Sequence, residues 1–372
     1  LVQNLFRVET LGEISIKGRQ MPVTVHRVIG ELPRLFFPTA EGVGGVPVPM
    51  VGREKEMAVL KELLVDAARD ERGSTVTLIG EAGVGKSRLV REFHRQLDEF
   101  PFKPLVFQAR TDQRLTDVPF SLIRDLLTRY FGIEEGDRAQ RIEEKLANGL
   151  ALVLEGDGRP GQNTRLRERA QTVGLLVGLD LPSRRRELRE RGVAGMIKER
   201  AIEAILEFLD MAVRKSPATL MVLEDIHWAD ADSLALLERV AALAADRPLL
   251  MVCLARPTIL ERWPRWPGEN PVGALSLPVR PLDGMGCRNL VLNILRKLPD
   301  IPPNLTDLII HSAAGNPYYV EELVRVLIED GIIIAGQDDW HIQPRKLTRL
   351  RVPATLTGVL QARLDRSPEM ER

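Results

Sequence analysis

The chain has 372 residues, of which 44% are hydrophobic and 28% charged. At about 150 residues per domain, this length predicts two or three domains, and the composition is that of a globular chain and excludes disordered and fibrous classes. Lys plus Arg and Asp plus Glu both number 52, so no overall field attracts nucleic acid or an anionic membrane. No apolar run approaches the roughly 18 residues that cross a bilayer.

The cysteines are only two, Cys253 and Cys287. They are too few for a disulfide framework or a zinc cluster, and we expect free thiols in a reducing cytoplasm. The chain begins with Leu1 inside a strand-like pattern, so we expect it to be a piece of a longer protein.

The N-terminal residues differ in pattern from the rest. Residues 6–28 carry apolar and β-branched residues in three short runs, with the turn-forming Lys17-Gly18-Arg19 stretch between the last two, which predicts a small hairpin. Residues 31–50 are rich in proline and glycine, and this composition predicts an interdomain linker. The hairpin, over residues 1–30, is too small to fold alone.

From residue 51 helical periodicity alternates with short apolar strands. The predicted strands are 75–79, 105–108, 219–224, 249–254 and 274–277, with helices over 54–69 and 86–97 among those between them. This alternation predicts an α/β fold with a doubly wound parallel sheet over 51–280, and ligands at the carboxyl ends of the strands.

Helical patterns fill much of the remaining chain. Residues 132–215 are predicted to be mostly helical and arginine-rich, and the glutamates interleaved in 184–191 favour a solvated helix face over a nucleic-acid patch. After residue 281 the pattern is helical again, and 354–364 predicts a final helix.

Residues 80–87 read Gly-Glu-Ala-Gly-Val-Gly-Lys-Ser and match the phosphate-binding pattern G-x-x-x-x-G-K-[ST] between a strand and a helix. The glycines let backbone N–H groups turn toward the phosphates. Lys86 would reach the β- and γ-phosphates, and Ser87 would bind Mg²⁺. Arg88 stands where a dinucleotide fingerprint needs its third glycine, which disfavours a redox enzyme. The predicted nucleotide-binding residues here are Gly80, Gly83, Val84, Gly85, Lys86, Ser87 and Arg88.

A second strand, 219–224, ends in the carboxylates Glu224 and Asp225. One would order the Mg²⁺ shell and the other would orient or deprotonate the attacking water, and spacing alone leaves both assignments open. For the neighbouring His227 and Trp228, packing is favoured over nucleotide contact.

Two further signals lie downstream. Arg256 ends the strand 249–254 and would point into the ligand crevice, where it could sense a γ-phosphate; a surface arginine is the alternative. Pro317 in Gly315-Asn316-Pro317 would hold a turn at a helix start against the base, a weak signal by itself.

Five segments carry a resemblance to a known family: Val51-Gly52-Arg53-Glu54, the phosphate loop, Leu223–Asp230, Ala255-Arg256-Pro257 and Gly315–Leu323. Taken in this order, they resemble the ATPases attached to bacterial class III nucleotide cyclases. These belong to the STAND branch of the AAA+ superfamily and are related to origin-recognition-type ATPases. The resemblance covers residues 50–372. It implies a P-loop NTPase core, a helical lid over 281–330 and the start of a winged-helix region over 331–372.

The resemblance also implies residue roles. Lys86 and Ser87 contact ATP or ADP and Mg²⁺, Glu224 orders the metal and Asp225 the water. Arg256 is the first sensor, and Gly52, Arg53 and Pro317 lie near the base. The family usually has a threonine two residues before the sensor arginine, where this chain has Leu254, so only the arginine carries over.

The first thirty residues resemble, over a shorter match, the final hairpin of a class III cyclase domain. The cyclase's metal-binding aspartates lie upstream in that family, so no cyclase activity is expected from this chain.

The sequence thus indicates an ATP-binding switch with slow hydrolysis, linked to an upstream cyclase domain. A downstream helical-repeat domain or protein-partner domain is a further expectation. Membrane and nucleic-acid partners are not expected. A DNA-binding transcriptional regulator that lacks its reader domain is the leading alternative, and a scaffold that binds nucleotide permanently is a third.

Overall fold

The computed structural model describes residues 6–14, 23–31, 42–70, 72–134, 136–154, 164–179, 194–267, 273–336 and 338–343, together with Lys346 and Gly358. The predicted turn at 17–19, the arginine-rich stretch 184–191 and, apart from Gly358, the predicted helix over 354–364 lie outside this part of the chain. The chain forms two compact units, Leu1–Glu41 and Gly42–Arg372.

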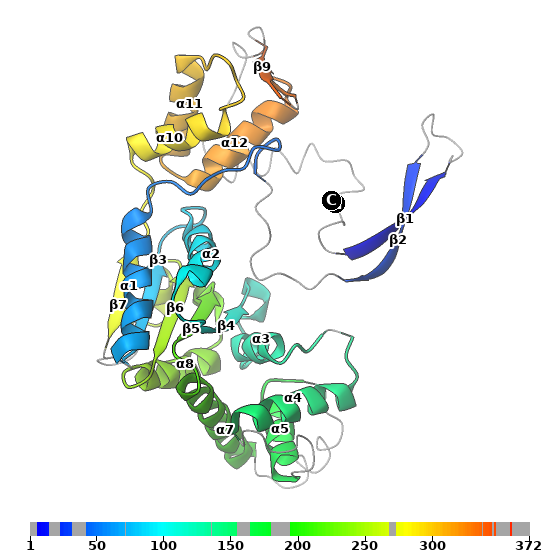
Figure 1. Ribbon diagram of the computed structural model, residues 1–372, viewed down its shortest axis with the longest axis vertical. Helices are drawn as coiled ribbons and strands as arrows, with labels where there is room; N and C mark the ends of the chain where they lie inside the picture. Colours follow the sequence, from blue (N-terminus) through cyan, green and yellow to red (C-terminus); the bar gives the residue numbers. More distant parts are fainter. Residues whose placement is uncertain are drawn as a thin grey trace. The chain divides into compact units, whose positions relative to one another are not determined.

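The first unit contains an antiparallel pair of strands, β1 (Phe6–Ile14) and β2 (Val23–Glu31) (Figure 1). β1 contains the run Phe6–Val8 and reaches Ile14, the first residue of the next run, with register shifts at Arg7/Val8 and Thr10/Gly12. An exposed ion pair between Arg27 and Glu9 joins the strands.

A five-stranded parallel sheet forms the centre of the second unit. Its order is β4-β5-β6-β3-β7. The strands are β3 (Ser74–Ile79), β4 (Leu105–Arg110), β5 (Thr219–Glu224), β6 (Leu249–Ala255) and β7 (Ala274–Pro278). The predicted parallel α/β sheet is confirmed, and all of its carboxyl ends meet at one edge.

Helices cover the sheet on both faces. Alternate strand residues, such as Met221, Leu223 and Met251, share a hydrophobic core with α3 (Ser121–Tyr130) and α8 (Ala231–Ala244). Helices α1 (Glu54–Asp70) and α2 (Lys86–Arg95) pack together outside that core, and α1 contacts β5 and β6. Because side chains alternate across a strand, α1 and α8 lie on opposite faces, as a doubly wound sheet requires.

Between β4 and β5 the chain forms a helical insertion of α4 (Ala139–Leu154), α5 (Thr164–Leu176) and α7 (Ala194–Arg214), which pack on one another (Figure 1). Aromatic side chains attach it to the sheet. Phe208 of α7 meets Phe107 of β4 edge-on, and the ring of Tyr130 stacks on Phe107 at 4.6 Å between centroids.

Residues 281–330, for which a helical lid was predicted and which are called the lid below, contain α10 (Gly284–Ile294), α11 (Pro303–Ala313) and α12 (Pro317–Glu329). The strand pair β8 (Ile333–Ala335) and β9 (Trp340–Ile342) follows them. The lid helices and this strand pair share a hydrophobic core, in which Trp340 is fully buried.

Residues 42–48 differ from the linker that the composition predicts over 31–50. Val43, Val46 and Val48 are buried in the core of the lid, and the ring of Trp340 lies against Gly44. Gly44 has φ +55, and a Cβ there would come within 2.7 Å of that ring, so glycine permits both the turn and the close approach. Proline and glycine here shape a packed segment, and residues 32–41 lie outside the described chain.

Candidate functional site

The phosphate loop joins β3 to α2. Gly83 and Gly85 have φ of +79 and +101, which side-chain-bearing residues rarely adopt. A Cβ on Gly80 would come within 2.4 Å of the Val279 carbonyl oxygen. The glycines therefore serve the turn and the close packing of the loop on the strand beside it.

Lys86 lies inside this loop and is largely buried. Its Nζ donates to the carbonyl oxygens of Gly80 at 2.6 Å and Glu81 at 2.9 Å. Burial lowers the pKa of Lys86, and the negative charge of Asp225 is the largest influence in the opposite direction. A partly desolvated ammonium beside carboxylates is a strong anion contact, because little water competes with the ligand.

Glu224 is the last residue of β5 and is 2% exposed. Burial raises its pKa, while the positive charge of Arg110 and a hydrogen bond with the Ser87 hydroxyl oppose that change. Its Oε1 is buried and has no hydrogen-bond partner among the described residues. A hydroxyl next to an under-satisfied carboxylate suits a hard cation that prefers oxygen ligands, so Ser87 and Glu224 fit Mg²⁺.

The described residues contain no group of three or more His, Cys, Asp or Glu side chains that could hold a metal. A magnesium ion bound together with a nucleotide commonly takes one or two oxygen ligands from the protein, and its remaining ligands come from water and phosphates.

Asp225 follows β5 in the left-handed conformation, with φ 58. This conformation is uncommon for a residue other than glycine and costs free energy. Residues held in such conformations are found mainly at functional sites. It turns the chain sharply into the short helix η3 (Ile226–Trp228). The turn leaves the Asp225 carboxylate more exposed than that of Glu224.

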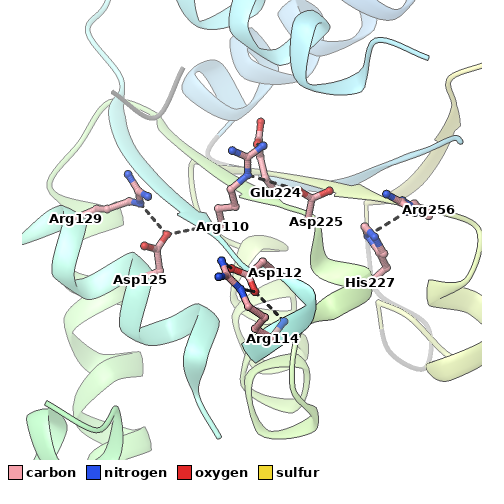
Figure 2. Close-up of polar contacts among 9 residues, drawn as sticks. All are labelled: Arg110, Asp112, Arg114, Asp125, Arg129, Glu224, Asp225, His227 and Arg256. Atoms are coloured by element: carbon pink, nitrogen blue, oxygen red, sulfur yellow. Dashed lines mark hydrogen bonds and ion pairs between the residues drawn. The ribbon is translucent and has the colours of Figure 1, made fainter. Parts of the chain in front are cut away.

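Arg110 was not expected from the sequence. Its Nη2 lies 2.7 Å from Glu224 Oε2 and its Nε 3.5 Å from Asp225 Oδ2, so one guanidinium bridges both acids (Figure 2). Arg110 ends β4 and pairs in register with Glu224. The rule that pointed to Arg256, a cation at the carboxyl end of a strand, would have found Arg110 as well.

The backbone at Arg110 is held by α3. The Arg110 N–H donates to Asp125 Oδ2 at 2.7 Å, and Asp125 Oδ2 also accepts from Arg129 Nε at 2.7 Å (Figure 2). The acidic pair is thus linked to α3 through a charged network.

Arg256 follows β6, beside the acidic turn. Its backbone N–H donates to His227 Nδ1 at 3.4 Å (Figure 2), and its charge lowers the pKa of Lys86. Arg256 therefore lies near the phosphate loop, and its role as a sensor of the γ-phosphate stays a prediction. His227 is buried.

The loop is contacted from its other side by the lid and by Arg53. Arg53 is 6% exposed, and its Nη2 donates to the carbonyl oxygens of Val84 at 2.9 Å and Arg280 at 2.7 Å. Asn316 Nδ2 donates to the Ala82 carbonyl oxygen at 2.9 Å. Pro317 begins α12 next to this contact.

Two of the predicted site residues have other partners. The Arg88 guanidinium donates to Glu92 at 2.9 Å and to the Val48 carbonyl oxygen, so its side chain ties α2 to the segment before α1. Gly52 has φ +67, and a Cβ there would meet Leu282 at 3.3 Å. Glycine at this position therefore permits a turn that packs closely against the lid.

The chain is similar to several known proteins. A model of the AAA ATPase domain matches residues 49–252, more than half of the chain. The uncharacterized protein R02095 of Rhizobium meliloti (strain 1021) is 29% identical over 316 residues, which are 84% of this chain and 28% of that protein. The chain therefore spans little more than a quarter of that relative.

Solved structures with similarity include the Orc1 protein of Aeropyrum pernix in complex with DNA (18% identity, 89% of this chain and 68% of that chain, TM-score 0.46). Another is Cdc6p of Pyrobaculum aerophilum (16% identity, 80% and 66%, TM-score 0.45). On the family match over residues 49–252, the chain belongs to the AAA ATPase domain family.

Proposed function

We propose that this chain binds ATP and ADP with Mg²⁺ at residues 80–87 and acts as a nucleotide-dependent switch with slow hydrolysis. The observation that carries the proposal is the position of Lys86: it is buried in a glycine-rich loop, with Asp225, Arg256 and Glu224 all close enough to influence its pKa. An isolated surface loop would not collect these four groups from three strand ends.

The roles of the residues follow from their surroundings. Lys86 would bind the β- and γ-phosphates, and Ser87 with Glu224 would hold Mg²⁺, which neutralises phosphate charge when bound. Asp225 would accept a proton from water as the water oxygen attacks the γ-phosphorus and the bond to the β–γ bridging oxygen breaks, which gives ADP and phosphate. Arg256 would contact the γ-phosphoryl oxygens.

Slow hydrolysis is supported by Arg110. Its guanidinium contacts both Glu224 and Asp225, so a cation there competes with Mg²⁺ for Glu224 and with the attacking water for Asp225. Turnover would require Arg110 to move away from the acids.

A switch needs two states that a ligand distinguishes. The lid supplies a contact that phosphate binding would alter, because Asn316 Nδ2 and the backbone N–H of Tyr318 donate to the carbonyl oxygens of Ala82 and Gly83. Any change of the loop around phosphates is thus transmitted to α12.

At the scale of the whole protein, we propose linkage to an upstream cyclase domain whose final hairpin is β1–β2, and a downstream protein partner. Residues 32–41 would be the linker and residues 331–372 the start of a winged-helix region. The length of the Rhizobium relative supports a longer protein. A cytoplasmic location is part of the proposal, supported by the buried free thiols of Cys253 and Cys287. No helix in the described part of the chain is long and apolar enough to span a membrane.

The test is nucleotide binding by Lys86→Ala in residues 1–372, measured by titration calorimetry. We expect micromolar binding of Mg-ATP or ADP to the unchanged chain and its loss in the variant, because the main cation facing the phosphates is gone. Lys61→Ala is the control, since Lys61 forms only a surface ion pair with Glu99. Equal affinity of the folded Lys86→Ala protein would disprove the assignment of the loop.

A further inference from the structure

His227 lies in η3, two residues after Asp225, and is 1% exposed. Two contacts hold it in place. Its Nδ1 accepts from the backbone N–H of Arg256 (Figure 2). Its main-chain carbonyl oxygen accepts from the guanidinium of Arg262 in α9 (Ile259–Arg262). The Nδ1 contact therefore joins the ring to the turn after β6, and the Arg262 contact holds the backbone that carries the ring.

These contacts decide where the ring carries its proton. Burial lowers the pKa of His227 to about 4, so the imidazole is neutral at neutral pH. A neutral imidazole has one donor and one acceptor nitrogen. Because Nδ1 accepts the Arg256 N–H, the proton is on Nε2, which is a donor.

This donor has no partner in the described structure. Nε2 of His227 is buried and makes no hydrogen bond with any described residue. A buried donor without an acceptor is costly, and native proteins keep few of them. The contact with the Arg256 N–H accounts for an acceptor at Nδ1, but it does not account for the second ring nitrogen, Nε2.

The surroundings indicate which acceptor suits Nε2. The charged groups that act on the ring are Asp225, Arg256, Lys86 and Arg262, three of them cations. An acceptor shared with Lys86 and Arg256 is anionic, and the phosphate loop brings the terminal phosphate of a nucleotide to Lys86. The adenine base would meet the loop from the other side, near Arg53.

We propose that the Nε2–H of His227 donates a hydrogen bond to the γ-phosphoryl group of ATP, so that His227 distinguishes ATP from ADP. This assignment rests on the proposed nucleotide site. A neutral donor adds direction without adding charge, whereas Lys86 and Arg256 supply the charge. Through Nδ1 the same ring positions the backbone of Arg256, so the two γ-phosphate contacts are coupled.

Two substitutions separate the two nitrogens. In His227→Gln the amide nitrogen can take the place of Nε2, and in His227→Asn the amide oxygen can take the place of Nδ1. The affinities of ATP and ADP are measured by calorimetry on residues 1–372 under conditions without turnover, with His311→Gln, on the exposed face of α11, as control. ADP affinity also reports whether each variant folds.

We expect His227→Asn to bind ATP roughly tenfold or more weakly, the order expected for a lost hydrogen bond to a charged group, with ADP affinity unchanged. His227→Gln should retain most of the preference for ATP. If His227→Asn retains the preference for ATP and His227→Gln loses it, only Nδ1 matters and the proposal is overturned. An equal loss of affinity for ATP and ADP, or no change of affinity in either variant, would also overturn it. In these cases the nucleotide site stands. Absence of binding by the unchanged chain would instead remove the proposed function and this proposal together.

Discussion

The two acids of β5 are neighbours in sequence but have unlike surroundings. Glu224 is buried next to the Ser87 hydroxyl, and burial raises its pKa. Asp225, in contrast, adopts a left-handed conformation and is more exposed. A buried carboxylate next to a hydroxyl is suited to holding a cation, and a carboxylate at a strained turn is suited to orienting a small nucleophile. These surroundings favour Glu224 for the metal and Asp225 for the water.

Amide substitutions test this division. Asp225→Asn should keep nucleotide binding and lower ATP turnover by something on the order of 10²- to 10⁴-fold, as for the loss of a general base. Glu224→Gln should shift the Mg²⁺ midpoint for ATP binding to higher concentration, because a neutral amide is a poorer partner for a hard cation. Both are measured by Mg²⁺ titration at fixed ATP and by phosphate release.

The opposite pattern, a shifted midpoint in Asp225→Asn and an unchanged one in Glu224→Gln, would reverse the roles. No effect of either change on binding or turnover would mean that β5 does not carry the metal site.

At the scale of elements, the segment before α1 belongs to the lid although it precedes the sheet in sequence. Val43 and Val46 are fully buried among lid residues, Gly42 accepts a hydrogen bond from Arg325 of α12 at 2.8 Å, and Val48 accepts one from Arg88 of α2. One short segment therefore contacts both the lid and the helix that follows the phosphate loop.

Val46→Ala should destabilise the lid by about 2 kcal/mol, through lost burial and a small cavity. That value corresponds to roughly 30-fold faster exchange of the protected α12 amides, which hydrogen–deuterium exchange measures. Val65→Ala is the control, since Val65 is 39% exposed on α1 and should change little. Unchanged protection in Val46→Ala would show that residues 42–48 do not stabilise the lid.

At the scale of the whole molecule, the β1–β2 hairpin forms a compact unit separate from the ATPase core and lid. Its described residues form a strand pair, and the chain spans 28% of its Rhizobium relative. A hairpin from a cyclase domain would not carry out the cyclase reaction by itself.

Purified residues 1–372 should form no cyclic nucleotide from ATP or GTP with Mg²⁺ or Mn²⁺. A two-metal site needs clustered carboxylates, and the acids before Val51 are only Glu9, Glu13, Glu31 and Glu41. The measurement is chromatographic detection of product after removal of host cyclase, with the Lys86→Ala protein as a matched preparation. Product that scales with the amount of this protein would contradict the prediction.

Local pattern was enough for the parallel sheet and for the phosphate loop. Strand and helix periodicity act over a few residues, and the loop's glycine spacing reflects a backbone requirement that is local as well. The same reasoning put Glu224, Asp225 and Arg256 at one edge, because the carboxyl ends of parallel strands coincide.

Only the tertiary structure revealed the contacts between distant segments. Arg110 reaches Glu224 because β4 pairs with β5 across more than a hundred residues, and the sequence does not encode that pairing locally. Val43 and Val46 are buried against lid residues that lie more than two hundred residues further along the chain. Their proline- and glycine-rich surroundings had instead predicted a linker. The sequence alone determined the elements and the phosphate-binding chemistry, whereas strand order and long-range packing decided which side chains meet, because burial depends on neighbours that local composition does not specify.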